Sequence, residues 1–352
     1  MIGAGALRIE TAGNAVVTDL GRSRGPAMGL ATGGASDQYS ARVANILVAN
    51  GDSEPLIEVT VFDLSFVAEV DLLIAVTGAP MTLLVDDVER SMWEPVSIGA
   101  GQRVTLTEMA AGLHTYVAVH GSFEVPLLLG SCAPDAAVGF GARVQPGDRL
   151  EVRTAIGPVV NPYFDMSLFN LGVLTPYFGD DAVVKVTDGP DEDEFAGTAG
   201  RLFQGPYTVT AKSNHIGLRM TGRLPVRTST TEVLSRGVPI GAVEVPPGDE
   251  LVVLHRGRGV TAGYPVLAVV TPVSLDDLGQ VRPGQRVCFR HITVEHAAQD
   301  VQEWHLRLQQ LRRRVATIYS ALGLAEPLGI ERNFRTAEGT AQGEEHRALQ
   351  RL

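Results

Sequence analysis

Short runs of alternating apolar and polar residues recur along the chain, and each run follows a turn built on glycine. Four such segments are residues 98–106, 144–152, 245–253 and 281–289. Alternation places successive side chains on opposite faces, as a β-strand requires, and Pro before Gly favours a type II turn. The pattern predicts a mainly β protein with few helices.

The same order of elements occurs on both sides of the middle of the chain. An apolar strand is predicted at 116–119, between the first two turn segments, and another at 265–270, between the last two. Two matches in the same order favour an internal duplication of a β domain. We therefore place a first domain at residues 1–157 and a second at residues 180–297.

Two helices are predicted from spacing. One begins after Ser36 and Asp37, where a capping residue precedes apolar residues at helical intervals. The other spans residues 298–330, where apolar side chains recur at spacings of four and three. These are Trp304, Leu308, Leu311, Val315, Ile318 and Leu322. The apolar face of this helix packs either on the protein itself or on a partner subunit.

Two further segments complete the predicted organisation. Residues 158–179 are rich in Pro, Gly and aromatic side chains, and because aromatic residues favour burial this stretch is interpreted as an ordered linker. Residues 331–352 are polar and contain glycine, which predicts a mobile tail.

Composition and charge exclude several classes of partner. The formal charge of −11 repels phosphate backbones and acidic membrane surfaces, so we expect neither nucleic acid nor a membrane as a partner. No signal-peptide pattern and no apolar stretch of about 18 residues occurs, which favours a cytoplasmic location. Cys132 and Cys288 are far apart and lack a CxxC neighbour, so neither a disulfide framework nor a metal site is expected.

Several motifs of nucleotide and cofactor chemistry are missing from the sequence. There is no Walker A motif, no GxSxG motif, and no lysine flanked by methionines of the kind that carries biotin. The chain has only two lysines, Lys185 and Lys212. We therefore expect no covalently bound cofactor, and any carboxyl-carrier group must come from another protein.

The first half of the chain contains one glycine-rich candidate site. Asp19 and Arg22 precede Gly34 and Asp37, at the expected start of a helix. Backbone N–H groups at such a position suit an anionic or carboxylate-bearing ligand. The alternative is a tight loop in which Asp37 only caps the helix.

Other candidates in the first half lie on predicted strands. Glu58 sits within an apolar run and must be hydrogen-bonded or paired if buried, either in a structural network or in a site. Thr77 and Gly78 end the apolar strand 72–76. His114 and His120 flank the strand at 115–119, and His120 ends it, where it serves either as a general base or structurally.

The second half adds two groups. Asn214, His215 and Arg219 present polar tips on a segment whose residues Ile216, Leu218 and Met220 are expected to pack, and arginine can clamp a carboxylate at two points. The loop 255–265 is basic and rich in glycine, which permits either close approach of a ligand or a tight bend.

A set of short segments, taken in order and at their spacing, resembles a known family. They are residues 19–22, 34–37, 45–48, 57–60, 77–79, 130–131, 207–209, 217–219, 239–242 and 263–265. The family comprises the carboxyltransferase subunits called allophanate hydrolase subunit 2 or the C subunit of 5-oxoprolinase, related to the carboxyltransferase domain of urea carboxylase. The resemblance covers about residues 5–297 and implies two cyclophilin-like β-barrels.

The resemblance also implies a function. It predicts a hydrolase or carboxyltransferase subunit acting on 5-oxoproline or a urea-like compound, in a hetero-oligomer with subunit 1 (the B subunit) and with the site shared between the two. ATP would act at the level of the complex, and biotin would be carried by a partner. The candidate catalytic residues are Asp37, Glu58, His120, His215 and Arg219. The candidate substrate-binding residues are Asp19, Arg22, Gly34, Thr77, Gly78, Asn214, Thr261, Gly263 and Tyr264.

The chain departs from the family pattern at several polar positions. Gly33 replaces a serine, His215 an arginine and His120 a glycine, and the loop 257–265 lacks an acid and an amide. Loss of a hydrogen-bonding side chain can change substrate discrimination by orders of magnitude. Two other hypotheses therefore stay open: a regulatory subunit that sequesters a partner protein without turnover, and a small-molecule-binding barrel that works alone.

Overall fold

The computed structural model describes residues 3–141, 143–154, 171–179, 181–229, 231–326, 328–331 and 333–334. Its described residues form two compact units. One unit comprises residues within 1–20, 38–177 and 305–352, and the other comprises residues within 21–37 and 178–304. The segment 21–37, which the sequence placed in the first domain, thus groups with the second unit. Most of the predicted linker and of the predicted tail lies outside the described residues.

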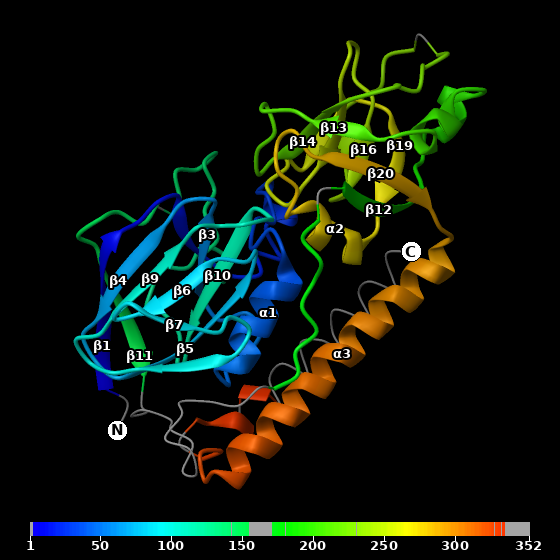
Figure 1. Ribbon diagram of the computed structural model, residues 1–352. Helices are drawn as coiled ribbons and strands as arrows, with labels where there is room; N and C mark the ends of the chain where they lie inside the picture. Colours follow the sequence, from blue (N-terminus) through cyan, green and yellow to red (C-terminus); the bar gives the residue numbers. More distant parts are fainter. Residues whose placement is uncertain are drawn as a thin grey trace. The chain divides into compact units, whose positions relative to one another are not determined.

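The first unit contains two antiparallel sheets that share one apolar core (Figure 1). The six-stranded sheet has the order β11-β1-β4-β9-β6-β7, with bounds β1 (Gly3–Thr11), β4 (Leu64–Ala68), β6 (Thr82–Val85), β7 (Val88–Arg90), β9 (Arg103–Thr107) and β11 (Arg149–Thr154). The five-stranded sheet has the order β2-β3-β10-β5-β8, with bounds β2 (Ala15–Thr18), β3 (Leu56–Thr60), β5 (Leu72–Gly78), β8 (Pro95–Ile98) and β10 (His114–Val119).

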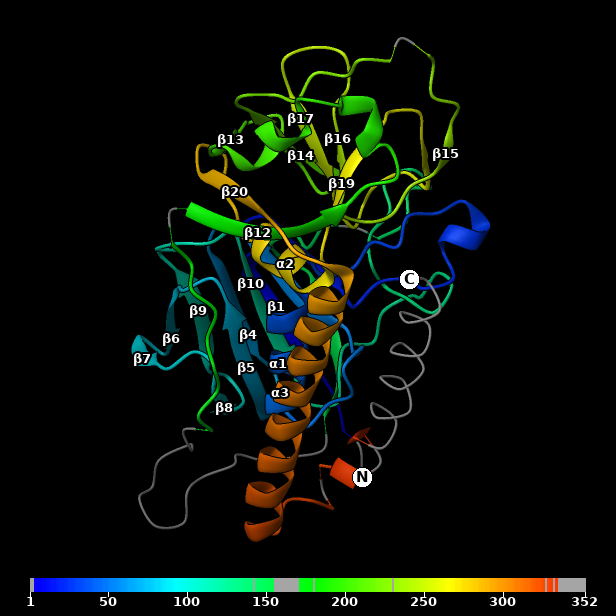
Figure 2. The ribbon, with the colours of Figure 1, turned by 90° about the vertical axis from the view of Figure 1, so that its right-hand side faces the viewer.

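Two helical segments pack within the first unit. Helix α1 (Gln38–Leu47) contacts β5 and β10 on the face of the five-stranded sheet that is turned away from the core. Helix α3 (Val294–Ala321) is one continuous helix, as Figure 2 shows, and its residues from 305 onward belong to this unit. Leu308, Leu311, Val315 and Tyr319 of α3 are buried. The apolar face of the predicted C-terminal helix therefore packs on the protein itself, although the helix begins at 294 and ends at 321.

The second unit is built around a closed barrel with its own core. The strand order is β12-β19-β16-β17-β14-β13-β20, with bounds β12 (Asp181–Asp188), β13 (Tyr207–Val209), β14 (Gly217–Thr221), β16 (Ala242–Glu244), β17 (Leu251–Leu254), β19 (Val266–Val270) and β20 (Arg286–His291). The two-stranded pair of β15 (Arg236–Gly237) and β18 (Thr261–Ala262), helix α2 (Pro272–Leu278) and the 3-10 turns η1 (Pro26–Met28), η2 (Glu192–Phe195) and η3 (Ala199–Phe203) complete it.

The local sequence pattern explains these strands. Each of the four predicted turn segments contains a glycine with positive φ, at Gly101, Gly147, Gly248 and Gly284, and each is followed by a strand. Positive φ costs little for glycine because it has no Cβ. The predicted apolar strands at 116–119 and 265–270 are β10 and β19. The mainly β class with a barrel, few helices and a C-terminal helix is confirmed.

No helix among the described residues is both long enough and apolar enough to cross a membrane.

Candidate functional site

A buried carboxylate and a tyrosine face each other on the outer side of the five-stranded sheet. Glu58 of β3 and Tyr116 of β10 are partners in the antiparallel register, so their side chains lie on the same face. The Tyr116 hydroxyl donates a hydrogen bond of 2.9 Å to Oε2 of Glu58, and both residues are buried. The prediction that Glu58 needs a polar partner is therefore confirmed.

His114 and Thr60 form the next pair in the same register. Nδ1 of His114 lies 3.8 Å from Oε1 of Glu58 and 3.1 Å from Oγ1 of Thr60. A carboxylate and an imidazole are both groups that can accept a proton from a bound molecule or deliver one to it. We call Glu58, Thr60, His114 and Tyr116 the Glu58 cluster.

Thr77 and Gly78 hold the end of β10 that carries His114. Oγ1 of Thr77 donates to the carbonyl oxygen of Ser40 at 2.7 Å, which ties β5 to α1. Gly78 has φ of +88°, and a Cβ on it would lie 2.5 Å from the carbonyl oxygen of His114. Only glycine fits this close approach without a shift of the strand. The two residues thus support the Glu58 cluster from the neighbouring strand.

A strained turn follows the cluster. Val61, next to Thr60, has φ of +62°, which is costly for a β-branched residue. Its neighbour Phe62 is 60% exposed. Because strained backbone is often retained where it serves a site, this turn is a candidate rim of the Glu58 cluster.

His120 lies at the opposite end of β10, about 20 Å from His114 along the strand at the usual rise per residue. Its Nδ1 is 2.7 Å from the carbonyl oxygen of Val48, so Nδ1–H donates and Nε2 is left as the acceptor. Burial lowers the pKa of His120, although the Val48 carbonyl opposes this shift, so the ring favours its neutral form. The structure does not bring His120 to the Glu58 cluster.

Asp19 has a bridging position in the same unit. Its carboxylate accepts hydrogen bonds from Oγ of Ser131 at 2.6 Å and from the backbone N–H of Cys132 at 2.8 Å. Asp19 is buried and joins the end of β2 to the loop at 130–133. These contacts support a structural role, and its predicted role in binding substrate stays a prediction.

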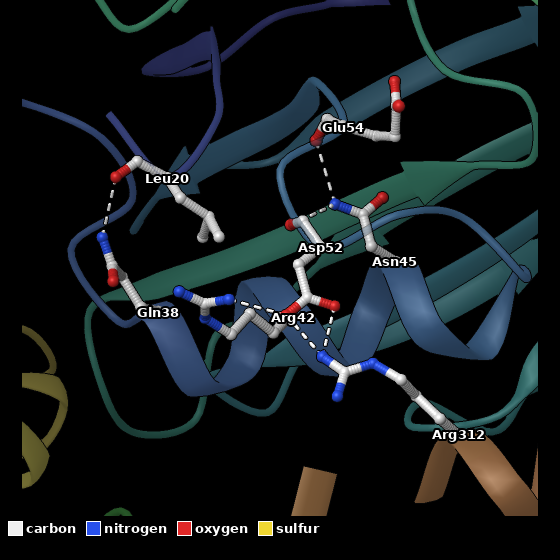
Figure 3. A network of polar contacts seen from close by, with 7 residues as sticks. All are labelled: Leu20, Gln38, Arg42, Asn45, Asp52, Glu54 and Arg312. Carbon is white, nitrogen blue, oxygen red and sulfur yellow. Dashed lines mark hydrogen bonds and ion pairs between the residues drawn. The ribbon is translucent and has the colours of Figure 1, made fainter. Parts of the chain in front are cut away.

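A buried ionic network anchors both helices of the first unit (Figure 3). The carboxylate of Asp52 pairs with Nη1 of Arg42 at 2.6 Å, and Nη2 of Arg312 contacts both of its oxygens. Nδ2 of Asn45 donates to the backbone oxygen of Glu54 at 2.9 Å. Since Arg42 and Asn45 lie on α1 and Arg312 lies on α3, the loop at 50–54 joins the two helices.

In the second unit, the glycine-rich segment packs on α2 and on the loop that begins at 255. Nε2 of Gln280 donates to Oδ2 of Asp37 at 2.8 Å. Arg256 pairs with Oδ1 of Asp276 at 3.1 Å, and its carbonyl accepts from the N–H of Gly33 at 2.9 Å. Asp37, Arg256, Asp276 and Gln280 are all buried. We call these four residues the Asp37 cluster.

Three residues of the Asp37 cluster were not predicted as site residues: Arg256, Asp276 and Gln280. The only signal for them in the sequence was the basic loop 255–265. Burial, and then the charge of Asp37, raise the pKa of Asp277 to about 6. The side chain of Asp277 is exposed, so solvent screens much of this effect.

Arg22 and Gly34 belong to the same segment. Arg22 is fully buried, and its backbone N–H donates to Thr32 at 2.8 Å. Gly34 has φ of +92°, and Gly21 would place a Cβ 2.5 Å from the carbonyl oxygen of Gly33. These glycines let the segment fold back on itself around Arg22.

The polar residues predicted near 214–219 separate into two groups. Asn214 and His215 are exposed, and the carbonyl of His215 accepts from the N–H of Gly257 at 3.0 Å, beside the basic loop. Arg219 is on the barrel surface, paired with Glu250 at 3.3 Å. Leu218 and Met220 pack as predicted, whereas Ile216 is 45% exposed, so that part of the prediction was wrong.

Thr261, Gly263 and Tyr264 lie on or beside β18. Thr261 pairs with Gly237 of β15, and a Cβ on Gly263 would lie 3.2 Å from the carbonyl of Val233. Tyr264 is partly exposed. Among the described residues, no group of three histidine, cysteine or acidic side chains is placed to hold a metal ion.

The sequence matches one family model and known proteins. Residues 28–291 match the carboxyltransferase domain, subdomain A and B. The C subunit of 5-oxoprolinase from Escherichia coli (strain K12) is 32% identical over 306 residues, which cover 85% of this chain and 95% of that protein.

Two solved structures have a similar fold. The crystal structure of TTHA0988 is 31% identical, with a TM-score of 0.71 over 82% of this chain and 56% of that chain, so this chain spans little more than half of it. The Kluyveromyces lactis urea carboxylase has a TM-score of 0.77 at 23% identity, over 87% of this chain and 29% of that chain. The second likeness shows the fold alone.

Proposed function

This chain belongs to the family of the carboxyltransferase domain, subdomain A and B, and from that premise we propose that it is one subunit of an ATP-dependent complex that opens 5-oxoproline. One observation carries the proposal. The match to the C subunit of 5-oxoprolinase extends over 95% of that protein, whereas the chain corresponds to 29% of the urea carboxylase. A urea-like substrate is the alternative within the same class.

The Glu58 cluster supports this chemistry. In lactam opening, water adds to the carbonyl carbon, the C–N bond breaks, and the nitrogen takes up a proton. Such a reaction needs one group to accept a proton from water and one to deliver a proton to nitrogen. Glu58 and His114, 3.8 Å apart, are a carboxylate and an imidazole suited to these two tasks.

The other components belong to the complex. The sequence has no Walker A motif, so ATP is expected to bind a partner subunit or a shared surface, and biotin, if it takes part, is carried by another chain. The proposed partner is the B subunit, also called subunit 1.

The test is reconstitution. The full chain is purified with the products of neighbouring genes, and ADP release is measured with 5-oxoproline, urea or allophanate as substrate. We expect turnover with 5-oxoproline and a loss of at least about 100-fold in Glu58→Gln, as for removal of a general base. Exposed Glu89→Gln is the matched control. Absence of turnover with all three substrates would overturn the proposal.

A second candidate function is a regulatory subunit that sequesters a partner protein. The observation that favours it is the exposure of His215 and of Arg219, which pairs with Glu250 on the barrel surface. Stoichiometric co-purification without ADP release, unaffected by Glu58→Gln, would support this function instead.

A further inference from the structure

Two buried ionisable side chains of the second unit lack hydrogen-bond partners for atoms that need them. Glu244 is 3% exposed, and its Oε1 has no hydrogen-bond partner among the described residues. Arg258 is 6% exposed, and its Nη1 is likewise without one in that part of the chain. Buried polar groups are nearly always satisfied in native proteins, by the protein, by water or by a ligand. These two atoms therefore call for an occupant.

The strand register shows which side of the barrel Glu244 faces. Glu244 is the partner of Val252 in β17 and of Val266 in β19. Those valines pack in a small apolar cluster with Val238 and Leu254, separate from the main core to which Val243 belongs. Side chains of register partners share a face, so the Glu244 carboxyl lies beside this outer cluster.

The surroundings of Glu244 are apolar. Burial raises the pKa of Glu244 to about 7. The carboxyl is buried away from bulk water. It offers an acceptor oxygen, and near neutral pH it also carries a proton part of the time. A ligand N–H is the kind of group that such an oxygen binds.

Arg258 reaches the same outer cluster from the basic loop. Its Nε donates to the carbonyl oxygen of Val238 at 3.0 Å, which leaves the other face of the guanidinium for a second partner. Burial lowers the pKa of Arg258. No ion pair joins Arg258 to Glu244 or to another acid within the described ranges. A ligand carboxylate would supply the missing counter-charge through two parallel hydrogen bonds.

Strands β15 and β18 cover this outer cluster, and few interactions hold them in place. Strands β15 and β18 are paired only through Arg236 with Ala262 and Gly237 with Thr261, and Ala262 packs on the outer cluster. Arg236 also pairs with Asp191, whose carboxylate accepts from the N–H of Val266 at 2.7 Å. The N–H of Val238 also donates to the carbonyl oxygen of Val260 at 3.1 Å. A ladder this short can open locally without unfolding the barrel.

We propose that Glu244 and Arg258 form a ligand site on the outer face of this barrel, under β15 and β18, for a small molecule that carries a carboxylate and an amide N–H. Arg258 binds the carboxylate, Glu244 accepts from the N–H, and the valines contact the carbon skeleton. A lactam acid such as 5-oxoproline has this set of groups, and naming it as the occupant rests on the proposed function. This is a second site for that molecule, in addition to the Glu58 cluster where it is proposed to react. The predicted substrate-binding residue Thr261 is part of the cover.

The experiment measures binding by isothermal titration calorimetry, to the full chain and to its complex with the partner subunits. The probes are 5-oxoproline, 2-pyrrolidinone, which lacks the carboxylate, and cyclopentanecarboxylate, which lacks the amide. We expect 5-oxoproline to bind at least about tenfold more tightly than either analogue, equivalent to about 1.4 kcal/mol.

Variants separate a ligand site from a buried water. Glu244→Leu and Arg258→Met should each weaken binding of 5-oxoproline at least about tenfold, while Glu244→Gln, which keeps an acceptor oxygen, should bind within a few-fold of the wild type. Exposed Glu232→Gln is the control, and thermal unfolding verifies that each variant is folded.

The outcomes are distinct. Unchanged binding in both Glu244→Leu and Arg258→Met, or no binding of 5-oxoproline to chain or complex, would overturn the site and leave water as its only occupant. Binding that depends on both residues, in a complex that shows no turnover, would support the site while overturning the proposed reaction.

Discussion

Tyr116 lies directly opposite Glu58 on a neighbouring antiparallel strand and donates a 2.9 Å hydrogen bond to its carboxylate. Both side chains are buried, so the bond is not exposed to bulk water. His114 stands two residues before Tyr116 and shares its face of the sheet, which brings the imidazole within 3.8 Å of the same carboxylate. The polar contacts of the cluster therefore depend on the packing of one strand pair.

Tyr116→Phe should destabilise the fold. The substitution keeps the ring but removes the donor to Glu58, and leaving a buried acceptor without its partner costs about 1–3 kcal/mol. Urea unfolding of the full chain measures the change in the free energy of unfolding. Tyr264→Phe is the control, because Tyr264 is partly exposed. Equal urea midpoints for wild type and Tyr116→Phe would show that the bond contributes nothing.

His114→Gln should reduce turnover of the reconstituted complex with little change in KM. If His114 delivers or accepts the proton, its loss lowers kcat by about 100-fold or more. A residue that only supports the fold would instead change the unfolding midpoint and leave kcat of the folded fraction intact. His296→Gln is the control, since His296 is exposed on α3. Full activity of His114→Gln would remove this residue from the mechanism.

The strands could be predicted because their signals are local. The glycines at 101, 147, 248 and 284 supply positive φ, and the alternation that follows each of them spans only a few residues. The start of α1 after Asp37 was predicted for the same reason, from a capping position and helical spacing. Neither prediction needed any knowledge of which strands pair.

The partners in the site could not be predicted, because they depend on register between distant strands. The sequence indicated that Glu58 needs a polar neighbour, but Tyr116 is 58 positions away and its position opposite Glu58 depends on how β3 and β10 align. The same alignment selects His114 rather than His120. Likewise, no local signal shows that residues 21–37 group with the second unit, where Asp37 meets Gln280.

Arg312→Met should loosen the C-terminal part of α3. The substitution removes one of the two buried arginines that pair with Asp52. Because Arg42 remains as a partner, we expect a cost below the about 3–5 kcal/mol of leaving a buried charge unpaired. We expect faster limited proteolysis near the end of the helix and a lower unfolding midpoint. Arg313→Met is a matched control, because Arg313 is the next residue and is exposed. Identical proteolysis of the two variants would contradict this role.

Glu244 should make stability depend on pH in a way that a glutamine does not. The carboxyl titrates near 4.5 in an unfolded chain and near 7 in the folded protein, because burial disfavours its charged form. Between these pH values the folded state binds more protons than the unfolded state, so the free energy of unfolding contributed by Glu244 falls as pH rises. The loss, complete above pH 7, is about 3 kcal/mol.

The free energies of unfolding of wild type and Glu244→Gln, measured at pH 5 and pH 8, isolate the contribution of Glu244, because other groups titrate alike in both proteins. We expect Glu244→Gln to gain stability relative to the wild type on going from pH 5 to pH 8, and a constant difference between them would show that Glu244 is charged in the folded protein throughout.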